Sequence, residues 1–142
     1  MDAETLEQFA SYHLRRLSHD ADAWHALAQA DPRIVPILIN AIRTEHDARV
    51  RVLILEAIRN YREPASIPCF AEALADPEPS VWKQALDGLV ALDRPECIVA
   101  IEDARGRTFP REEDAILFRE WLDEAVAQLR HGYFREKDDP EV

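Results

Sequence analysis

Apolar residues along the chain recur at spacings of three and four, the pattern that places them on one face of an α-helix. In residues 3–17, for example, Leu6, Phe9 and Leu17 fall on such a face. Aspartate or proline precedes most of these stretches, as is typical of helix starts. The pattern predicts eight helices, which span residues 3–17, 20–28, 31–42, 47–61, 63–74, 81–92, 94–101 and 112–129.

The helical pattern repeats with a period of just over thirty residues. Residues 47–58 match residues 78–89, 31 positions later, with acidic, valine, leucine and small residues in register. Pro32, Pro64 and Pro95 repeat at spacings of 32 and 31. A period of this length, built from two helices, is typical of stacked helix pairs. The sequence therefore predicts an all-α fold, a right-handed α-solenoid of about four antiparallel helix pairs.

Two further prolines repeat inside the predicted helices. Pro36 and Pro68 are 32 residues apart, and each lies four residues after the proline that opens its repeat. A proline within a helix removes a hydrogen bond and kinks the axis, whereas a proline at the first helical position costs nothing. We therefore expect a bend at Pro36 and Pro68 as a regular part of the repeat.

The repeated residues resemble the HEAT-like repeat, in particular the short variety found in phycobilisome-lyase-type proteins. The matching pattern is carried by Asp47, Val50, Arg51, Ala57, Ile58, Pro64 and Ile67. It recurs less fully at Glu78, Val81, Ala85, Leu89, Pro95 and Ile98. Trp82 departs from it, since it stands where the preceding repeat has Arg51. The resemblance is clear over residues 31–107. We expect one repeat domain over residues 1–132, and the composition of residues 133–142 predicts a polar, acidic tail.

The resemblance also implies that the second helices of the pairs line a concave face that binds a protein partner. The residues expected there are Arg51, Leu55, Glu56, Arg59, Trp82, Lys83, Leu86, Asp87, Val90, Glu120, Trp121, Asp123 and Glu124. Tryptophan is enriched at the centres of protein interfaces, which makes Trp82 the main candidate for an interface anchor. The alternative is that Trp82 packs between helices. Trp24 and Trp121 fall on apolar stripes and are interpreted as core residues.

Charge narrows the kinds of partner. The chain has 17 basic and 28 acidic residues, a formal net charge of −11. Nucleic acid and membrane surfaces would repel such a protein, whereas a basic protein partner would be attracted. Solubility alone also explains the acidity. The acidic start, Met1-Asp2-Ala3-Glu4, lacks the features of a secretory signal, so we expect a cytoplasmic protein. Homo-oligomerisation stays open.

Catalytic and cofactor motifs are absent from the sequence, so we expect neither an enzyme nor a bound cofactor. His13, His19 and His25 are six residues apart, which on a continuous helix puts them on different faces. Cys69 and Cys97 lack metal-ligand spacing, and we expect both to be buried thiols.

Three functions remain. The first is a non-catalytic scaffold or adaptor that binds a protein through its concave face. The second is a small acidic immunity protein or antitoxin that neutralises a basic toxin domain. The third is an enzyme, such as a bilin-lyase-like protein, although no chromophore-handling motif is visible.

Overall fold

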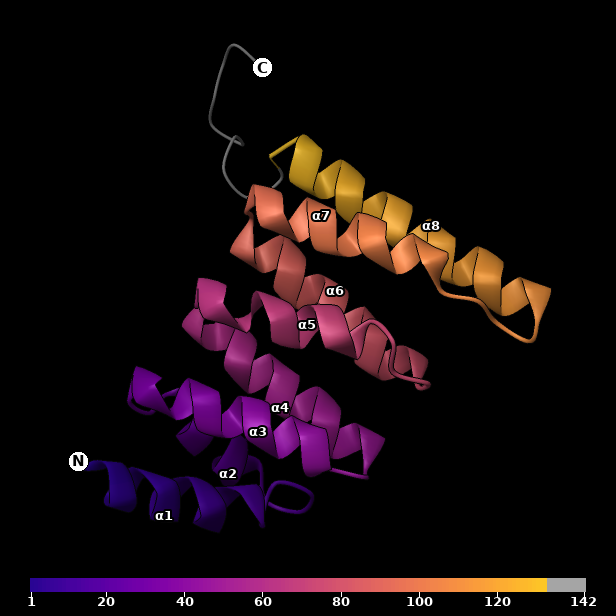
Figure 1. The fold of residues 1–142 in the computed structure, drawn as a ribbon. Helices are drawn as coiled ribbons and strands as arrows, with labels where there is room; N and C mark the ends of the chain where they lie inside the picture. Colours follow the sequence, from indigo (N-terminus) through magenta and orange to yellow (C-terminus); the bar gives the residue numbers. More distant parts are fainter. Residues whose placement is uncertain (133–142) are drawn as a thin grey trace. The chain divides into compact units, whose positions relative to one another are not determined.

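A computed structural model of the chain describes residues 1–132, and every regular element in that part is helical (Figure 1). The all-α prediction is confirmed, and the eight predicted helices are present. They are α1 (Ala3–Leu14), α2 (Ala21–Ala28), α3 (Val35–Thr44), α4 (Ala48–Tyr61), α5 (Ile67–Ala73), α6 (Pro79–Leu92), α7 (Pro95–Asp103) and α8 (Glu112–Arg130). Three 3₁₀ turns join them, namely Pro32–Ile34, Pro64–Ser66 and Ala104–Gly106. The acidic tail predicted at 133–142 lies outside the described residues.

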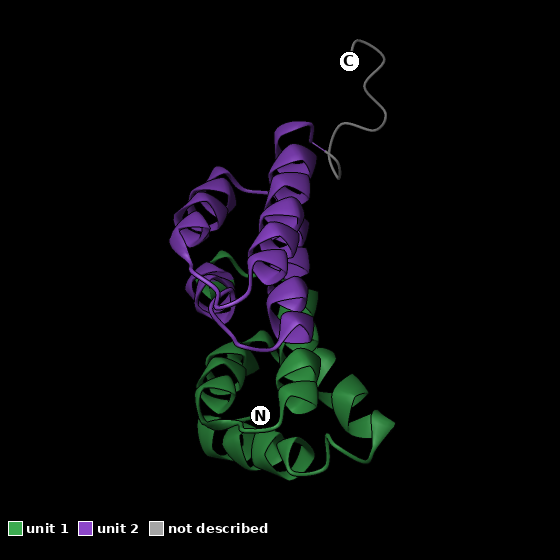
Figure 2. Ribbon diagram, turned by 90° about the vertical axis from the view of Figure 1, so that its right-hand side faces the viewer, with its two compact units in different colours: residues 1–66 green, residues 67–142 purple. Residues whose placement is uncertain are grey.

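The helices belong to two compact units (Figure 2). Unit 1 is Met1–Ser66 and holds α1 to α4, and unit 2 begins at Ile67 and holds α5 to α8. The same plan occurs in both. Consecutive helices pack as pairs, the first helices of the pairs lie together (α1 with α3, α5 with α7), and so do the second helices (α2 with α4, α6 with α8). The expectation of one domain over 1–132 stays a prediction.

The inner prolines begin the α-helices and do not bend them. Pro32 and Pro64 each open a 3₁₀ turn, and the α-helix starts only after it, so that Pro36 and Pro68 are the second residues of α3 and α5. The first four N–H groups of a helix have no partner within it, so a proline there removes no hydrogen bond. The expected kink is therefore wrong.

Polar caps set several helix ends. Asp20 and Asp47 accept hydrogen bonds from backbone N–H groups at the starts of α2 and α4. At the other end, Arg62 and Asp93 close α4 and α6 with φ of 51° and 53°, in the left-handed conformation that ends many helices. These two residues are 31 apart, so the repeat extends to the backbone of the caps.

In unit 1, side chains of α4 hold the end of α2. The Tyr61 hydroxyl donates to the carbonyl of Leu27 (2.5 Å) and accepts from the N–H of Ala30 (2.8 Å). The indole N–H of Trp24 donates to the carbonyl of Leu53 (3.1 Å), so this half-buried residue joins α2 to α4. The two Tyr61 bonds satisfy backbone groups that the end of a short helix leaves without partners.

In unit 2, α5 and α6 approach closely at a glycine. A Cβ atom at Gly88 would lie 2.4 Å from Cε1 of Phe70, whose side chain is fully buried. The missing side chain therefore makes room for the phenyl ring. Cys69 and Cys97 are buried thiols, as expected, and burial raises the pKa of the Cys97 thiol.

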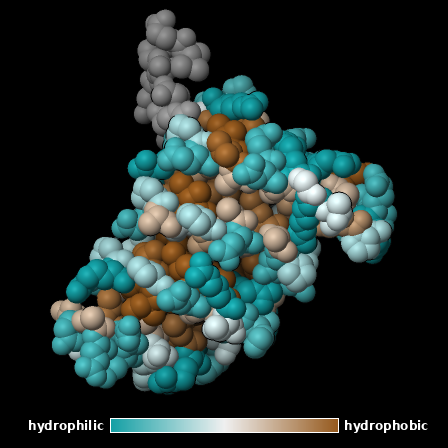
Figure 3. All heavy atoms as spheres, viewed as in Figure 1, coloured by the Kyte–Doolittle hydropathy of each residue, from teal (hydrophilic) through white to brown (hydrophobic). Residues whose placement is uncertain are grey.

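Hydrophobic residues form patches bordered by hydrophilic ones on the face drawn in Figure 3. Within residues 1–132, no helix combines the length and the apolar character that a membrane crossing requires.

Candidate protein-interaction surface

The residues expected on α4 do not form an open binding face in unit 1. Leu55 is fully buried, and Glu56 and Arg59 are half-buried. Arg51 donates to the carbonyls of Glu45 (3.1 Å) and His46 (3.0 Å), and so binds the loop that precedes its own helix. Leu55 is thus wrong as a contact residue, because it belongs to the core.

The residues expected on α6 are also largely in the core. Only 2% of the surface of Trp82 and of Leu86 is exposed, and Val90 is buried. The Trp82 ring meets Phe118 edge-on at 4.9 Å between centroids. Packing, the alternative role of Trp82, is the one that the structure supports. Asp87 is exposed on the same helix.

Trp121 on α8 was expected both on the binding face and, from its apolar stripe, in the core. The structure supports the first position, because 37% of Trp121 is exposed. Its ring stands edge-on to Trp82 at 6.2 Å, and the half-buried Lys83 ammonium lies 4.8 Å from its centroid. Trp82 therefore acts as a buried support for an exposed tryptophan. The helical stripe was read one position too wide, because Trp121 lies at the edge of the apolar face formed by Phe118 and Leu122.

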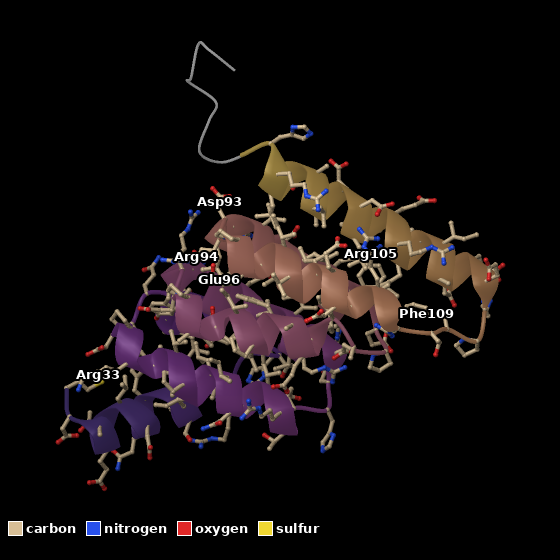
Figure 4. All side chains as sticks on the ribbon, turned by 45° about the horizontal axis from the view of Figure 1, so that its top comes forward. Arg33, Asp93, Arg94, Glu96, Arg105 and Phe109 are labelled. Atoms are coloured by element: carbon tan, nitrogen blue, oxygen red, sulfur yellow. The ribbon has the colours of Figure 1, made fainter. Side chains whose placement is uncertain are left out.

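Glu120, Asp123 and Glu124 are exposed on α8, as expected. Asp123 pairs with Arg105 at 2.8 Å, and Arg105, labelled in Figure 4, belongs to the 3₁₀ turn that follows α7. The side-chain amide of Gln128 donates to Glu124 at 3.2 Å. Asp123 therefore serves within the unit, while Glu120 and Glu124 lie on a different side of the helix.

One side of α8 combines exposed apolar and acidic residues. At 3.6 residues per turn, residues within about 60° of Leu117 make up a single strip. We call this strip the acidic α8 face; it consists of Glu113, Asp114, Leu117, Glu120, Trp121, Glu124 and Gln128. Leu117 is 37% exposed, like Trp121. The arginines within α8, Arg119 and Arg130, lie about 140–160° away from Leu117. Two basic residues from outside α8 do reach this face, since Arg111 pairs with Glu113 at 2.6 Å and Lys83 lies against Trp121.

A cavity of about 310 Å³ lies at the N-terminal end of the acidic α8 face. Its lining residues are Pro77, Pro79, Trp82, Arg107, Phe109, Pro110, Asp114 and Leu117. Phe109 comes from the loop between α7 and α8 (Figure 4). The cavity thus joins the start of α6, this loop and the first turns of α8, all within unit 2. We call it the proline–aromatic pocket.

Arg107 fixes the loop that forms the pocket. Its guanidinium donates to the carbonyl of Leu74 (2.7 Å) and lies over the rings of Phe109 (4.4 Å) and Phe118 (5.2 Å). Burial lowers the pKa of Arg107, which nonetheless stays charged at neutral pH. Arg107, Phe109 and Leu117 were not predicted from the sequence. The available signal was Phe109 itself, an aromatic residue between a threonine and a proline in the stretch that joins two predicted helices.

A second cavity, in unit 1, brings together two histidines that the sequence analysis separated. His19, Asp20 and His25 line a space of about 400 Å³ beside Trp24. The six-residue rotation applied to a continuous helix, but the chain turns between α1 and α2, so the argument failed there. Within the described residues, no group of three His, Cys, Asp or Glu side chains is arranged to hold a metal ion.

The pairing of helices, the repeat of about 31 residues and the matching caps agree with the comparison with protein families, in which the model of HEAT repeats matches residues 14–116. The chain belongs to the HEAT-repeat family. The match does not single out the phycobilisome-lyase type. Neither the curated proteins nor the solved structures contain a match to the chain. HEAT repeats mediate protein–protein interactions in general and are typically non-catalytic scaffolds, which makes the exposed apolar residues of this HEAT-repeat protein the first place to look for a partner.

Proposed function

We propose that this HEAT-repeat protein is a non-catalytic interaction module that binds a basic partner protein through the acidic α8 face. The observation that carries the proposal is the exposure of Leu117 and Trp121 among the carboxylates of Glu113, Asp114 and Glu120. Apolar side chains surrounded by polar ones are the usual arrangement of a protein interface. Tryptophan is also among the residues that contribute most to binding.

The basic character of the partner follows from charge. The protein has a formal net charge of −11, and four of its carboxylates surround the apolar pair on α8. Arg111 pairs with Glu113, which leaves Asp114, Glu120 and Glu124 as the acidic groups of this face that have no basic partner within residues 1–132. Such a surface accelerates association with a positively charged protein and disfavours acidic ones. A second copy of this chain would bring like charges together, so self-association through this face is disfavoured. The same repulsion applies to nucleic acid.

The support that Trp82 gives to Trp121 favours a preformed site. Trp82 is buried against Phe118 and meets the Trp121 ring edge-on, while Lys83 lies over that ring. A side chain that is already held in place loses less conformational entropy when a partner binds. The α8 face therefore has the properties of an anchor site, and the concave location of the second helices stays a prediction.

The test is affinity capture from cell lysate with the parent protein and two variants, followed by mass spectrometry. We expect Leu117→Ser combined with Trp121→Ser to reduce recovery of a basic partner at least tenfold, as loss of interface anchors does. Val99→Ser is the matched control, because Val99 is 60% exposed on α7 and lies outside the face. Circular dichroism verifies that each variant is folded.

The outcomes separate the functions that remain. A single stoichiometric basic partner with a toxin domain, released at high salt, would make the protein an immunity protein or antitoxin. Several partners lost together in the double variant would favour a scaffold. Equal recovery by the double variant and the parent would contradict the proposed face.

A further inference from the structure

The proline–aromatic pocket adjoins the acidic α8 face and shares two residues with it, Asp114 and Leu117. A partner that covers Leu117 therefore also covers the mouth of the pocket. At about 310 Å³ the pocket is near the lower end of the range for small-molecule sites, which suits a single large side chain.

The lining of the pocket favours an apolar occupant. Three proline rings, two aromatic rings and Leu117 form most of its wall. Its two charged residues, Arg107 and Asp114, have opposite signs. The Arg107 guanidinium is held in place, because it donates to the Leu74 carbonyl and lies over Phe109. A cationic side chain in the pocket would meet this fixed guanidinium, whereas an apolar one would gain from the rings without that repulsion.

The carboxylates beside the pocket favour a helical partner segment. Along α8, Glu120 lies about 4.5 Å beyond Leu117 and Glu124 about 10.5 Å beyond it, at 1.5 Å per residue. A helix laid alongside presents residues at the same intervals when they are three or four and seven positions apart. An extended strand repeats each face at about 6.6 Å and does not match both positions.

We propose that the pocket receives one bulky apolar side chain from a basic amphipathic helix of the partner protein, whose lysines or arginines one and two turns away pair with Glu120 and Glu124. This inference rests on the proposed function and specifies the chemistry of the partner. The charge complementarity of the acidic α8 face selects the occupant, since a second copy of this chain or an acidic helix would be repelled.

The test uses synthetic helical peptides of about 16 residues, long enough to form a helix on binding. Each carries one leucine anchor and two lysines at the fourth and seventh positions from it, in either direction along the chain. A peptide of identical composition has its lysines on the opposite face. We call the first the matched peptide and the second the rearranged peptide. Fluorescence anisotropy at low salt should show that the matched peptide binds at least tenfold more tightly than the rearranged peptide.

Three further changes locate the contacts. Replacing the leucine anchor with alanine should weaken binding about thirtyfold, the loss typical of an interface hot spot. In the protein, Glu120→Gln with Glu124→Gln should weaken binding about tenfold at low salt and less at high salt. Glu96→Gln with Asp103→Asn is the matched control, because it removes two exposed carboxylates of α7 and should change the affinity less than twofold.

A double-mutant cycle links the anchor to the pocket. The losses from the alanine anchor and from Leu117→Ser should not add up, because both changes remove the same contact. Any of four results would overturn the inference. The matched peptide does not bind, the two peptides bind equally, the losses in the cycle are additive, or the α7 and α8 charge variants have equal effects. The proposed function would survive each of these results if capture of the partner still depends on Leu117 and Trp121.

Discussion

Two positions at the same place in the repeat, Arg51 in unit 1 and Trp82 in unit 2, serve different purposes. Arg51 donates to the carbonyls of Glu45 and His46 and so closes the loop before α4. Trp82 is buried against Phe118, supports Trp121 and forms one wall of the proline–aromatic pocket. The repeat therefore fixes where a helix lies, while the residues that break the repeat decide what its unit can bind.

The largest effect that would sharpen this comparison is expected at Trp82. Trp82→Ala should lower the free energy of unfolding by about 3–5 kcal/mol, because it leaves a cavity beneath Trp121. Arg51→Ala should lower it by about 1–2 kcal/mol, because two hydrogen bonds to loop carbonyls, one part-buried and one exposed, are lost. Urea unfolding followed by circular dichroism measures both. Equal losses would mean that the two positions contribute alike, contrary to the structure.

The helix contact in unit 2 offers the next test. Phe70 and Gly88 occupy the register positions of Leu38 and Ala57 in unit 1, so a larger residue on one helix accompanies a smaller one on the other. Gly88→Ala should lower the free energy of unfolding by about 2 kcal/mol, since its Cβ would lie 2.4 Å from the buried Phe70 ring and overpacking outweighs the gain in helix propensity.

The control replaces Gly88 and Phe70 with the residue types found at the matching positions of unit 1, alanine and leucine. In the Gly88→Ala background, Phe70→Leu should restore part of the lost stability, because leucine vacates the space that the new methyl group needs. A double-mutant cycle should show coupling of about 1 kcal/mol or more. Additive losses in urea unfolding would show that the two side chains do not share this space. In unit 1, Ala57→Gly should cost about 2 kcal/mol, because it loses helix propensity and also removes a fully buried methyl group.

Much of the fold could be predicted from the sequence, because helix starts and apolar stripes are local properties. The predicted pairs and the buried cysteines are confirmed. The misplaced bend at Pro36 arose because a 3₁₀ turn before a helix has no distinct sequence pattern. The α8 site was predicted only in part. Glu120 and Glu124 were placed correctly on the surface. For Trp82 the structure supports packing, one of the two roles predicted, and Trp121, expected both on the face and in the core, is exposed.

The missing part of the site depends on contacts between distant segments. Trp82 is buried because Phe118, 36 residues later, lies against it, and periodicity within α6 carries no information about that. The pocket also needs Arg107 and Phe109, which lie in a loop where no period applies. Their hydrogen bond and ring contacts become visible only once α5, α6 and α8 are placed together within unit 2.

The smallest effect is expected where the repeats begin, at residues that precede a proline. Asp31 accepts hydrogen bonds from the side chain and the backbone N–H of Arg33, which lower its pKa from 3.8 to about 2. Arg94, before Pro95, makes no side-chain cap bond. A carboxyl whose pKa is lower in the folded state stabilises the fold above its unfolded pKa, and this contribution is lost as the pH falls through the folded value.

Asp31→Asn should therefore change the pH dependence of unfolding in one window only. The difference in stability between parent and variant should be constant above about pH 5 and should shrink as the pH falls towards about 2, because the unfolded parent binds a proton there before the folded parent does. Urea unfolding at closely spaced pH values measures this difference. Arg94→Asn is the control, and its difference from the parent should not vary over the same window. A constant difference for Asp31→Asn down to about pH 2 would show that the Arg33 contact does not hold the carboxylate in its charged form.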